Sequence, residues 1–193
     1  MQFTMLKQTM TAFMAARERR RQILYRAFHD ELTGLPNRYS FRDRLEEALA
    51  GRRAPSKGFA VIYVDVDRFK VVNDQFGHSA GDELLKHVGA CLAATLRAGD
   101  TAARVGGDEF ALLLLDVGDT SQVDAAVHRL HDALRHPARI DDRNVMVSCS
   151  IGFSLFPQDG SDAHRLLHQA DMSMYRHKRS GAAKRHFDGM PAA

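Results

Sequence analysis

Two short acidic clusters hold the residue types of this chain that could carry out chemistry. The first comprises Asp65 and Asp67, which flank Val66, and the second is Asp108 with Glu109, directly after a Gly-Gly pair. Carboxylate oxygens are the ligands that Mg²⁺ prefers, usually one or two from the protein together with substrate phosphates. Two such ions can stabilise both the attacking and the leaving oxygen of a phosphoryl group. The two clusters therefore indicate metal-dependent phosphoryl chemistry, provided that the fold brings them together.

Each cluster has a simpler structural interpretation when it is taken alone. An aspartate after a strand commonly forms a turn or caps a helix. A Gly-Gly pair between two short strands is typical of a tight hairpin, because both glycines accept positive φ. Two carboxylates at the tip of a hairpin, beside a neighbouring strand that also ends in aspartate, are better explained by a bound cation and an anionic ligand.

The segments around the clusters predict an α+β domain. Alternating or apolar patterns indicate strands over four segments: 59–65, 102–105, 109–115 and 145–155. Helical patterns cover four others, the first of them capped by Asn37: 38–50, 79–97, 120–135 and 162–179. We expect 67–77 to be an irregular connection and 184–187 a short closing strand. This mixture of hairpins and helices predicts a central sheet with helices packed on its faces.

The N-terminal segment, residues 1–29, predicts one further helix. A heptad pattern runs through it at eight positions, six of them apolar: Phe3, Leu6, Met10, Phe13, Arg17, Arg20, Leu24 and Ala27. Two interpretations stay open, a short coiled coil and an amphipathic helix that packs on its own domain. The arginines within 17–21 are interpreted as a solvated face and not as a nucleic-acid patch.

Length and composition limit the class of protein. The chain of 193 residues suits one domain of about 160 residues with a short extension. No apolar run approaches the roughly 18 residues that a membrane-spanning helix needs. Lys7 and the following arginines interrupt any signal-peptide core, so we expect none. Cys91 and Cys149 are the only cysteines, which favours reduced thiols and a cytoplasmic location.

Four ordered blocks of the sequence resemble the GGDEF-domain diguanylate cyclases. They lie at residues 30–38 (DELTGLPNR), 65–82 (DVDRFKVVNDQFGHSAGD), 104–110 (RVGGDEF) and 170–178. The resemblance covers about residues 28–187 and implies a fold similar to nucleotidyl cyclases and polymerase palms. It implies a GGDEF domain over 30–188, preceded by a signalling or dimerisation helix over 1–29 and followed by a tail over 189–193.

The resemblance also implies an activity. Two GTP molecules would condense to cyclic di-GMP with release of two pyrophosphates, each site of a homodimer holding one GTP. Two Mg²⁺ or Mn²⁺ ions per site would bind Asp65, the carbonyl of Val66, and Asp108. Asp108 would also act as general base, Glu109 would help to hold the second ion, and Lys70 would stabilise charge on the transferring phosphoryl group. For Lys70, a solvated loop lysine is the competing interpretation.

Further positions match the nucleotide-binding residues of the family. Asn73 and Asp82 match guanine-binding residues, and a carboxylate can accept both adjacent donors of guanine, whereas adenine presents a lone pair. Capping of the 79–97 helix is the alternative role for Asp82. The remaining matches are His78 on the substrate side, Phe69 through its backbone amide at the phosphates, and Lys178 at the β and γ phosphates.

Two features of the resemblance bear on control. Arg97 and Asp100 form an R-x-x-D pattern five residues before the glycine pair, which fits the family's product-inhibition site; a surface ion pair is the alternative. Ala182 departs from the family, which commonly has a phosphate-contacting arginine there; Lys184 or Arg185 are the candidates to compensate.

Three functions follow as hypotheses. The first is an active cyclase, regulated by its product and by an upstream sensor domain or protein. The second is a catalytically silent GGDEF domain that binds GTP or cyclic di-GMP for signalling. The third is a polymerase-like or adenylyl cyclase domain, which Asp82 argues against because its carboxylate suits guanine.

Overall fold

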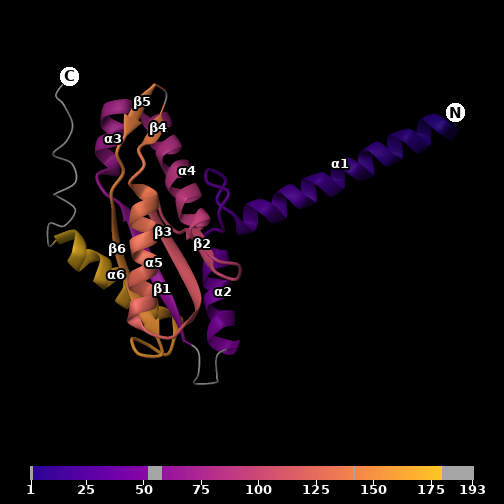
Figure 1. Cartoon of the computed structure of the whole chain (residues 1–193). Coiled ribbons are helices and arrows are strands. Elements are labelled where there is room, and N and C mark those ends of the chain that lie inside the picture. The colour runs from indigo at the N-terminus through magenta and orange to yellow at the C-terminus, as the bar shows by residue number, and fades with distance from the viewer. Residues whose placement is uncertain (1, 52–57, 141, 180–193) are drawn as a thin grey trace.

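The computed structural model describes residues 2–51, 58–140 and 142–179 (Figure 1). Its helices are α1 (Gln2–Phe28), α2 (Arg38–Gly51), α3 (Phe69–Phe76), α4 (His78–Ala94), α5 (Thr120–Leu134) and α6 (Ala163–Arg179). Its strands are β1 (Gly58–Val66), β2 (Thr101–Arg104), β3 (Glu109–Val117), β4 (Ala138–Ile140), β5 (Arg143–Val145) and β6 (Cys149–Phe156).

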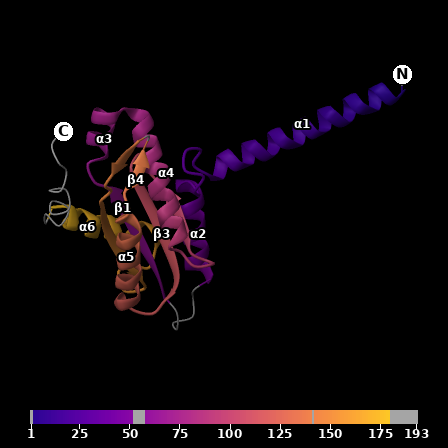
Figure 2. The same cartoon turned by 45° about the horizontal axis from the view of Figure 1, so that its top comes forward.

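A four-stranded antiparallel sheet forms the centre of the domain, in the order β2-β3-β1-β6. Side chains of β1 are buried on both faces of the sheet: Ile62 and Val64 belong to the core beneath α4 and α5, and Phe59 and Val61 to the core beneath α2 and α6. The domain therefore has three layers, with a helical layer on each face of the sheet (Figure 2). This confirms the predicted α+β class.

Several element boundaries differ from the prediction. The segment expected to be an irregular connection contains α3, because Phe69, Val72 and Phe76 recur at helical spacing and pack on the larger core. Gly77, with φ of 86°, separates α3 from α4. The predicted cap is confirmed at α2, where the Asn37 side chain accepts a hydrogen bond from the backbone N–H of Ser40 at 3.0 Å.

The strand expected over 145–155 begins later in the sequence than predicted. Val145 belongs to β5, which pairs with β4 in a separate two-stranded hairpin, and β6 begins at Cys149. Val147, between the two strands, is buried and so continues the apolar alternation of the sequence. The carbonyl oxygen of Ser148, however, accepts a hydrogen bond from the backbone N–H of Asp67 and not from a strand residue. Residues 184–187 and 189–193 lie outside the described residues.

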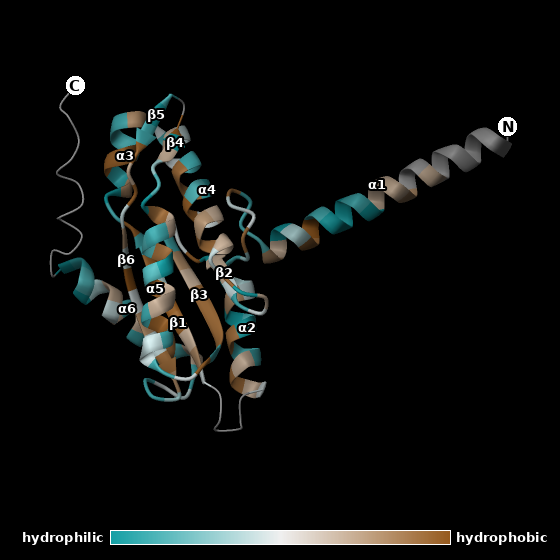
Figure 3. Ribbon diagram, in the orientation of Figure 1, coloured by the Kyte–Doolittle hydropathy of each residue, from teal (hydrophilic) through white to brown (hydrophobic). Residues whose placement is uncertain are grey.

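Helix α1 projects away from the rest of the domain (Figure 1). Its apolar side chains Phe13, Ile23 and Leu24 are at least half exposed, and brown and teal residues alternate around it (Figure 3). The interpretation that this helix packs on its own domain is therefore wrong for residues 13–24, whereas its last turn contacts the segment 34–40 through Tyr25, Ala27 and Phe28. Within the described residues, no helix combines the length and the hydropathy needed to cross a membrane.

Gly152 is required where β6 crosses α6. A Cβ atom at this position would collide with the backbone of Met174 and lie 2.5 Å from the carbonyl oxygen of Ala170. We expect Gly152→Ala to force α6 off the sheet and destabilise the domain by about 1–3 kcal/mol, because backbone atoms cannot move aside as side chains can. Thermal unfolding followed by circular dichroism measures this as a fall in Tm of roughly 3–10 °C.

The matched control is Gly51→Ala, at the end of α2, where an added Cβ has no atom within 4 Å. Its Tm is expected to stay the same or to rise slightly, because alanine favours helix over glycine. Equal Tm values for Gly152→Ala and the unchanged chain would show that the α6–β6 contact is not tight.

Candidate active site

The two acidic clusters meet at one end of the central strand pair. In the antiparallel register of β1 with β3, Asp65 lies opposite Glu109. One residue further, the backbone N–H of Val66 donates to the carbonyl oxygen of Asp108 at 3.1 Å. Pairing of these strands therefore brings Asp65 into one small region with Asp108 and Glu109, which lie 43 and 44 positions further along the sequence.

The glycine pair shapes the turn between β2 and β3, although not by positive φ. Neither Gly106 nor Gly107 is among the glycines with a left-handed backbone, so the explanation through φ is wrong. At Gly106, an added Cβ would collide with the carboxylate of Glu109. The missing side chain at this position thus leaves room for Glu109 against the turn.

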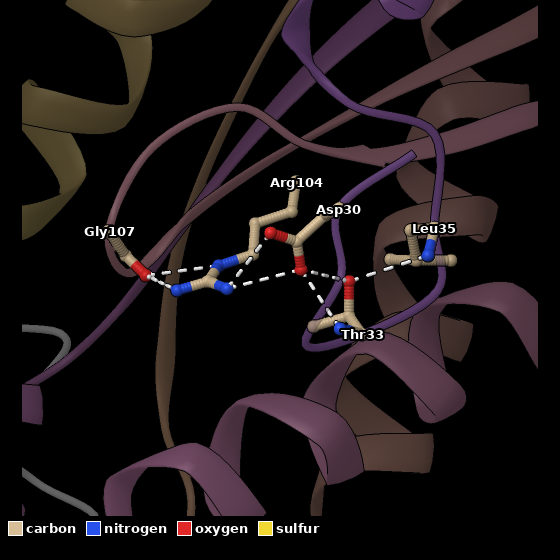
Figure 4. A network of polar contacts seen from close by, with 5 residues as sticks. All are labelled: Asp30, Thr33, Leu35, Arg104 and Gly107. Carbon is tan, nitrogen blue, oxygen red and sulfur yellow. Dashed lines mark hydrogen bonds and ion pairs between the residues drawn. The ribbon is translucent and has the colours of Figure 1, made fainter. Parts of the chain in front are cut away.

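Two arginines hold this turn, and sequence reasoning gave neither of them a role. Arg104 donates to the carbonyl oxygen of Gly107 through Nε at 3.2 Å and Nη2 at 2.7 Å, and its Nη1 contacts both carboxylate oxygens of Asp30 (Figure 4). Arg38 donates through Nε to the carbonyl oxygen of Val105 at 2.7 Å. The position of Arg104 directly before the turn was the feature of the sequence that could have indicated its role.

Asp30 anchors this network from the segment before α2. Its Oδ1 also accepts hydrogen bonds from the backbone N–H and the hydroxyl of Thr33, at 2.9 and 2.7 Å (Figure 4). Burial acts to raise the pKa of Asp30, but the bonds from Thr33 and Arg104 outweigh it, so the pKa is lowered. The carboxylate remains charged and keeps Arg104 on the turn.

Asp67 differs from the other acidic residues in its hydrogen-bond partners. Its carboxylate is buried and accepts a hydrogen bond from the Ser150 hydroxyl at 2.6 Å, while its backbone N–H donates to the carbonyl of Ser148. These bonds tie the end of β1 to β6. Asp67 is therefore a structural residue of the first cluster, and Asp65 is the member that faces the second cluster.

The carboxylates of Asp65 and Glu109 lie in surroundings that favour a bound cation. Burial raises the pKa of Asp65, with Asp108 and Asp67 adding to the effect and Lys178 opposing it. Burial likewise raises the pKa of Glu109, and the charges of Asp65 and Asp108 raise it further. Like charges held together in a partly desolvated place are stabilised by a positive ion.

The donor set fits magnesium better than a metal held by side chains alone. Among the described residues, no group of three or more His, Cys, Asp or Glu side chains is arranged to hold an ion. The groups expected to bind metal, the carboxylates of Asp65 and Asp108 and the carbonyl of Val66, are all oxygen donors. Mg²⁺ commonly binds in this way, retaining waters and substrate phosphates as its other ligands.

A second group of predicted residues surrounds the junction of α3 and α4. Asn73 has a side-chain oxygen that is buried without a hydrogen-bond partner. An added Cβ on Gly81 would collide with that oxygen, so the glycine allows the two helices to approach. Asp82 follows as an exposed residue in the second turn of α4, which rules out capping of this helix as its role.

The other predicted nucleotide-binding residues lie near the same junction or beside the acidic cluster. Phe69 and Lys70 form the start of α3, with Lys70 exposed, and His78 is exposed at the start of α4. Lys178, in the last turn of α6, is instead beside the acidic cluster, with its Nζ 2.6 Å from Oδ1 of Asp65.

Arg97 and Asp100 lie in the loop before β2, away from the acidic cluster. The carboxylate of Asp100 accepts from the backbone N–H of Arg97 at 3.1 Å and of Leu115 at 3.0 Å. Within the described residues the guanidinium of Arg97 makes no ion pair, so the surface ion pair between the two side chains is wrong. The two residues line a shallow groove of about 300 Å³.

Known proteins share this arrangement of elements. The chain is 41% identical to the bifunctional diguanylate cyclase/cyclic di-GMP phosphodiesterase MucR of Pseudomonas aeruginosa, over 83% of this chain and 23% of MucR. It is 38% identical to the diguanylate cyclase TpbB of the same organism, over 84% of this chain and 38% of TpbB. The chain thus spans less than two-fifths of the length of either relative.

Solved structures agree with the fold. The crystal structure of the TpbB GGDEF domain superposes with a TM-score of 0.74 at 38% identity, covering 77% of this chain and 92% of that one. The coiled coil and GGDEF domain of DgcB from Caulobacter crescentus, in complex with c-di-GMP, gives 0.78 at 26% identity, covering 91% and 93%.

The family model described as "Diguanylate cyclase, GGDEF domain" matches residues 27–184, which include every residue of the acidic cluster and of the α3–α4 junction. The chain therefore belongs to the GGDEF-domain family of diguanylate cyclases.

Proposed function

We propose that this chain is an active diguanylate cyclase, which converts two GTP molecules to cyclic di-GMP and two pyrophosphates. The observation that carries the proposal is the register of β1 with β3, which places Asp65 opposite Glu109 and beside Asp108. This oxygen-rich end of two buried strands occurs in a chain of the GGDEF family. Every acidic residue that the chemistry requires is present.

The reaction forms one phosphodiester bond at each of two sites. The 3′-oxygen of one GTP attacks the α-phosphorus of the other, and the bond between the α-phosphorus and the bridging oxygen to the β-phosphate breaks to release pyrophosphate. Asp108 accepts the hydroxyl proton, Glu109 would help to hold the second metal ion, and Lys70 stabilises the transferring phosphoryl group. Asp65, Asp108 and the Val66 carbonyl would hold Mg²⁺ or Mn²⁺, which would supply Lewis-acid stabilisation of the phosphoryl oxygens and of the attacking oxygen.

Guanine is proposed to bind at the junction of α3 and α4. The buried, unpartnered oxygen of Asn73 is a polar atom that a bound base can satisfy. Asp82, nine positions later in sequence, offers a carboxylate to the adjacent N1–H and amino donors of guanine. Phe69 is proposed to face the phosphates through its backbone N–H, and His78, at the start of α4, to lie on the substrate side.

Two chains are needed because each site holds one GTP. Two-fold symmetry makes the two attacks equivalent. The exposed apolar side chains of α1, which include Phe13 and Leu24, offer a surface for a coiled coil between copies. The groove at Arg97 and Asp100 is proposed to bind the product. The guanidinium of Arg97, which makes no ion pair with any residue that the structure describes, is available to donate two hydrogen bonds to guanine or phosphate.

A catalytically silent binding module is the second candidate. It is favoured by Ala182, which replaces a phosphate-contacting arginine of the family and lies outside the described residues. Such a module would bind GTP or cyclic di-GMP without turnover, so measurement of the product distinguishes the two.

The first test is the conversion of GTP to cyclic di-GMP by purified protein with Mg²⁺, quantified by chromatography. Asp108→Ala is expected to lower the rate by at least about 10²-fold, because it removes both a metal ligand and the proton acceptor. Glu46→Ala removes an exposed carboxylate of α2 and serves as control with an unchanged rate. A near-normal rate in Asp108→Ala would remove this residue from the site.

Asp82→Ser tests the assignment of the guanine site. We expect the preference for GTP over ATP to fall from about 10⁴-fold towards parity, since serine cannot accept both guanine donors and does not repel adenine. Competition of ATP with GTP in the same assay measures the preference. If selectivity for GTP is the same in the variant, the base is recognised elsewhere.

Arg97→Ala tests the proposed product site. We expect inhibition by added cyclic di-GMP to weaken by at least about tenfold, because a charged fork onto the product is lost, while the initial rate without product stays unchanged. Initial rates at increasing cyclic di-GMP concentrations give the inhibition constant. Inhibition of unchanged strength would place the product at another site or in competition with GTP.

A further inference from the structure

The one ion pair that reaches the acidic cluster in the described part of the chain joins α6 to β1. Lys178 places its Nζ 2.6 Å from Oδ1 of Asp65. The Asp65 side chain is only 11% exposed, whereas the Lys178 side chain is 44% exposed. The ammonium therefore approaches a nearly buried carboxylate from the solvent side.

The ammonium of Lys178 contacts the carboxylate of Asp65 and lies within the field of two further carboxylates. Burial acts to lower the pKa of Lys178, but the hydrogen bond and charge of Asp65, with the charges of Asp67 and Asp108, outweigh it and raise the pKa. The ion pair with Asp65 therefore puts the Lys178 ammonium at the place where the proposed function requires a metal ion. The two cations compete for Oδ1 of Asp65.

We propose that Lys178 is a resident counter-ion of Asp65, which gives way only when metal and triphosphate arrive together, so that the site takes the metal–nucleotide complex in preference to free metal. This inference rests on the proposed function and defines the form in which its substrate binds. Lys178 then forms an ion pair first with the carboxylate of Asp65 and afterwards with the triphosphate.

The charges at the site favour joint binding of metal and nucleotide. A free divalent cation that displaces the ammonium from Asp65 leaves a positive side chain beside a doubly positive ion, without a new partner. A triphosphate supplies that partner, and the long, half-exposed stem of Lys178 can reorient without movement of α6. Metal and nucleotide therefore favour each other's binding, and the coupling is reciprocal.

The test uses Mn²⁺ alone as the first probe, with free Mn²⁺ measured by electron paramagnetic resonance. We expect Lys178→Met to bind Mn²⁺ about tenfold more tightly than the unchanged chain in the absence of nucleotide, because the competing cation is gone. Lys178→Gln, which keeps a hydrogen-bond donor without charge, is expected to show the same gain. Arg165→Met removes a positive charge from the first turn of the same helix and is expected to change nothing.

The second probe is a GTP analogue with a methylene bridge between the α and β phosphates. In the unchanged chain this analogue should tighten Mn²⁺ binding at least about tenfold, and in Lys178→Met the enhancement should fall towards unity. Mn²⁺ affinity that is unchanged or weaker in both Lys178 variants would overturn the inference while leaving the proposed function intact. A folded, unchanged chain that binds no Mn²⁺–analogue complex would instead contradict the proposed function, and the inference with it.

Discussion

The pairing of β1 with β3 is the constraint on which the rest of this structure depends. It holds the carboxylates of Asp65 and Glu109 opposite each other, with Asp108 adjacent, at the end of two strands that are buried on both faces. Burial of these carboxylates, together with their like charges, raises the pKa values of Asp65 and Glu109, so the arrangement is unfavourable without a cation. Burial of the strands between two helical layers stabilises an arrangement that the acidic side chains alone would disfavour.

Two groups of contacts fix this arrangement from outside the strand pair. Arg104 and Arg38 hold the turn before β3 through its carbonyl oxygens, and Asp30 holds Arg104. On the other side, the bond from Ser150 to Asp67 fixes the end of β1. The acidic side chains thus lie on a rigid support, whereas Lys178 and Lys70, the cations assigned to the phosphates, are exposed side chains with room to move.

Much of this organisation was predictable from the sequence, because buried strands and acidic clusters have strong local signals. The alternation over 59–65 and the apolar run after Glu109 identified the two strands that form the centre of the sheet. The short helix α3 was missed because it lies between two polar segments and has only three core residues, Phe69, Val72 and Phe76. The early start assigned to β6 followed from alternation at Val145 and Val147, which are buried without belonging to that strand.

Roles that depend on long-range contacts could not be predicted in the same way. No local pattern distinguishes Asp67, bonded to Ser150, from Asp65, which faces Glu109, or shows that Lys178 rests on Asp65 113 residues away. The central claim, that this chain joins two GTP molecules between two copies of itself, is tested most directly by the yield of cyclic di-GMP per molecule of protein across a range of protein concentrations with Mg²⁺. The account predicts a specific yield that rises with concentration and then levels off as dimers saturate. Folded protein that makes no cyclic di-GMP at any concentration, or makes it with a specific yield independent of concentration down to the most dilute sample, would contradict it.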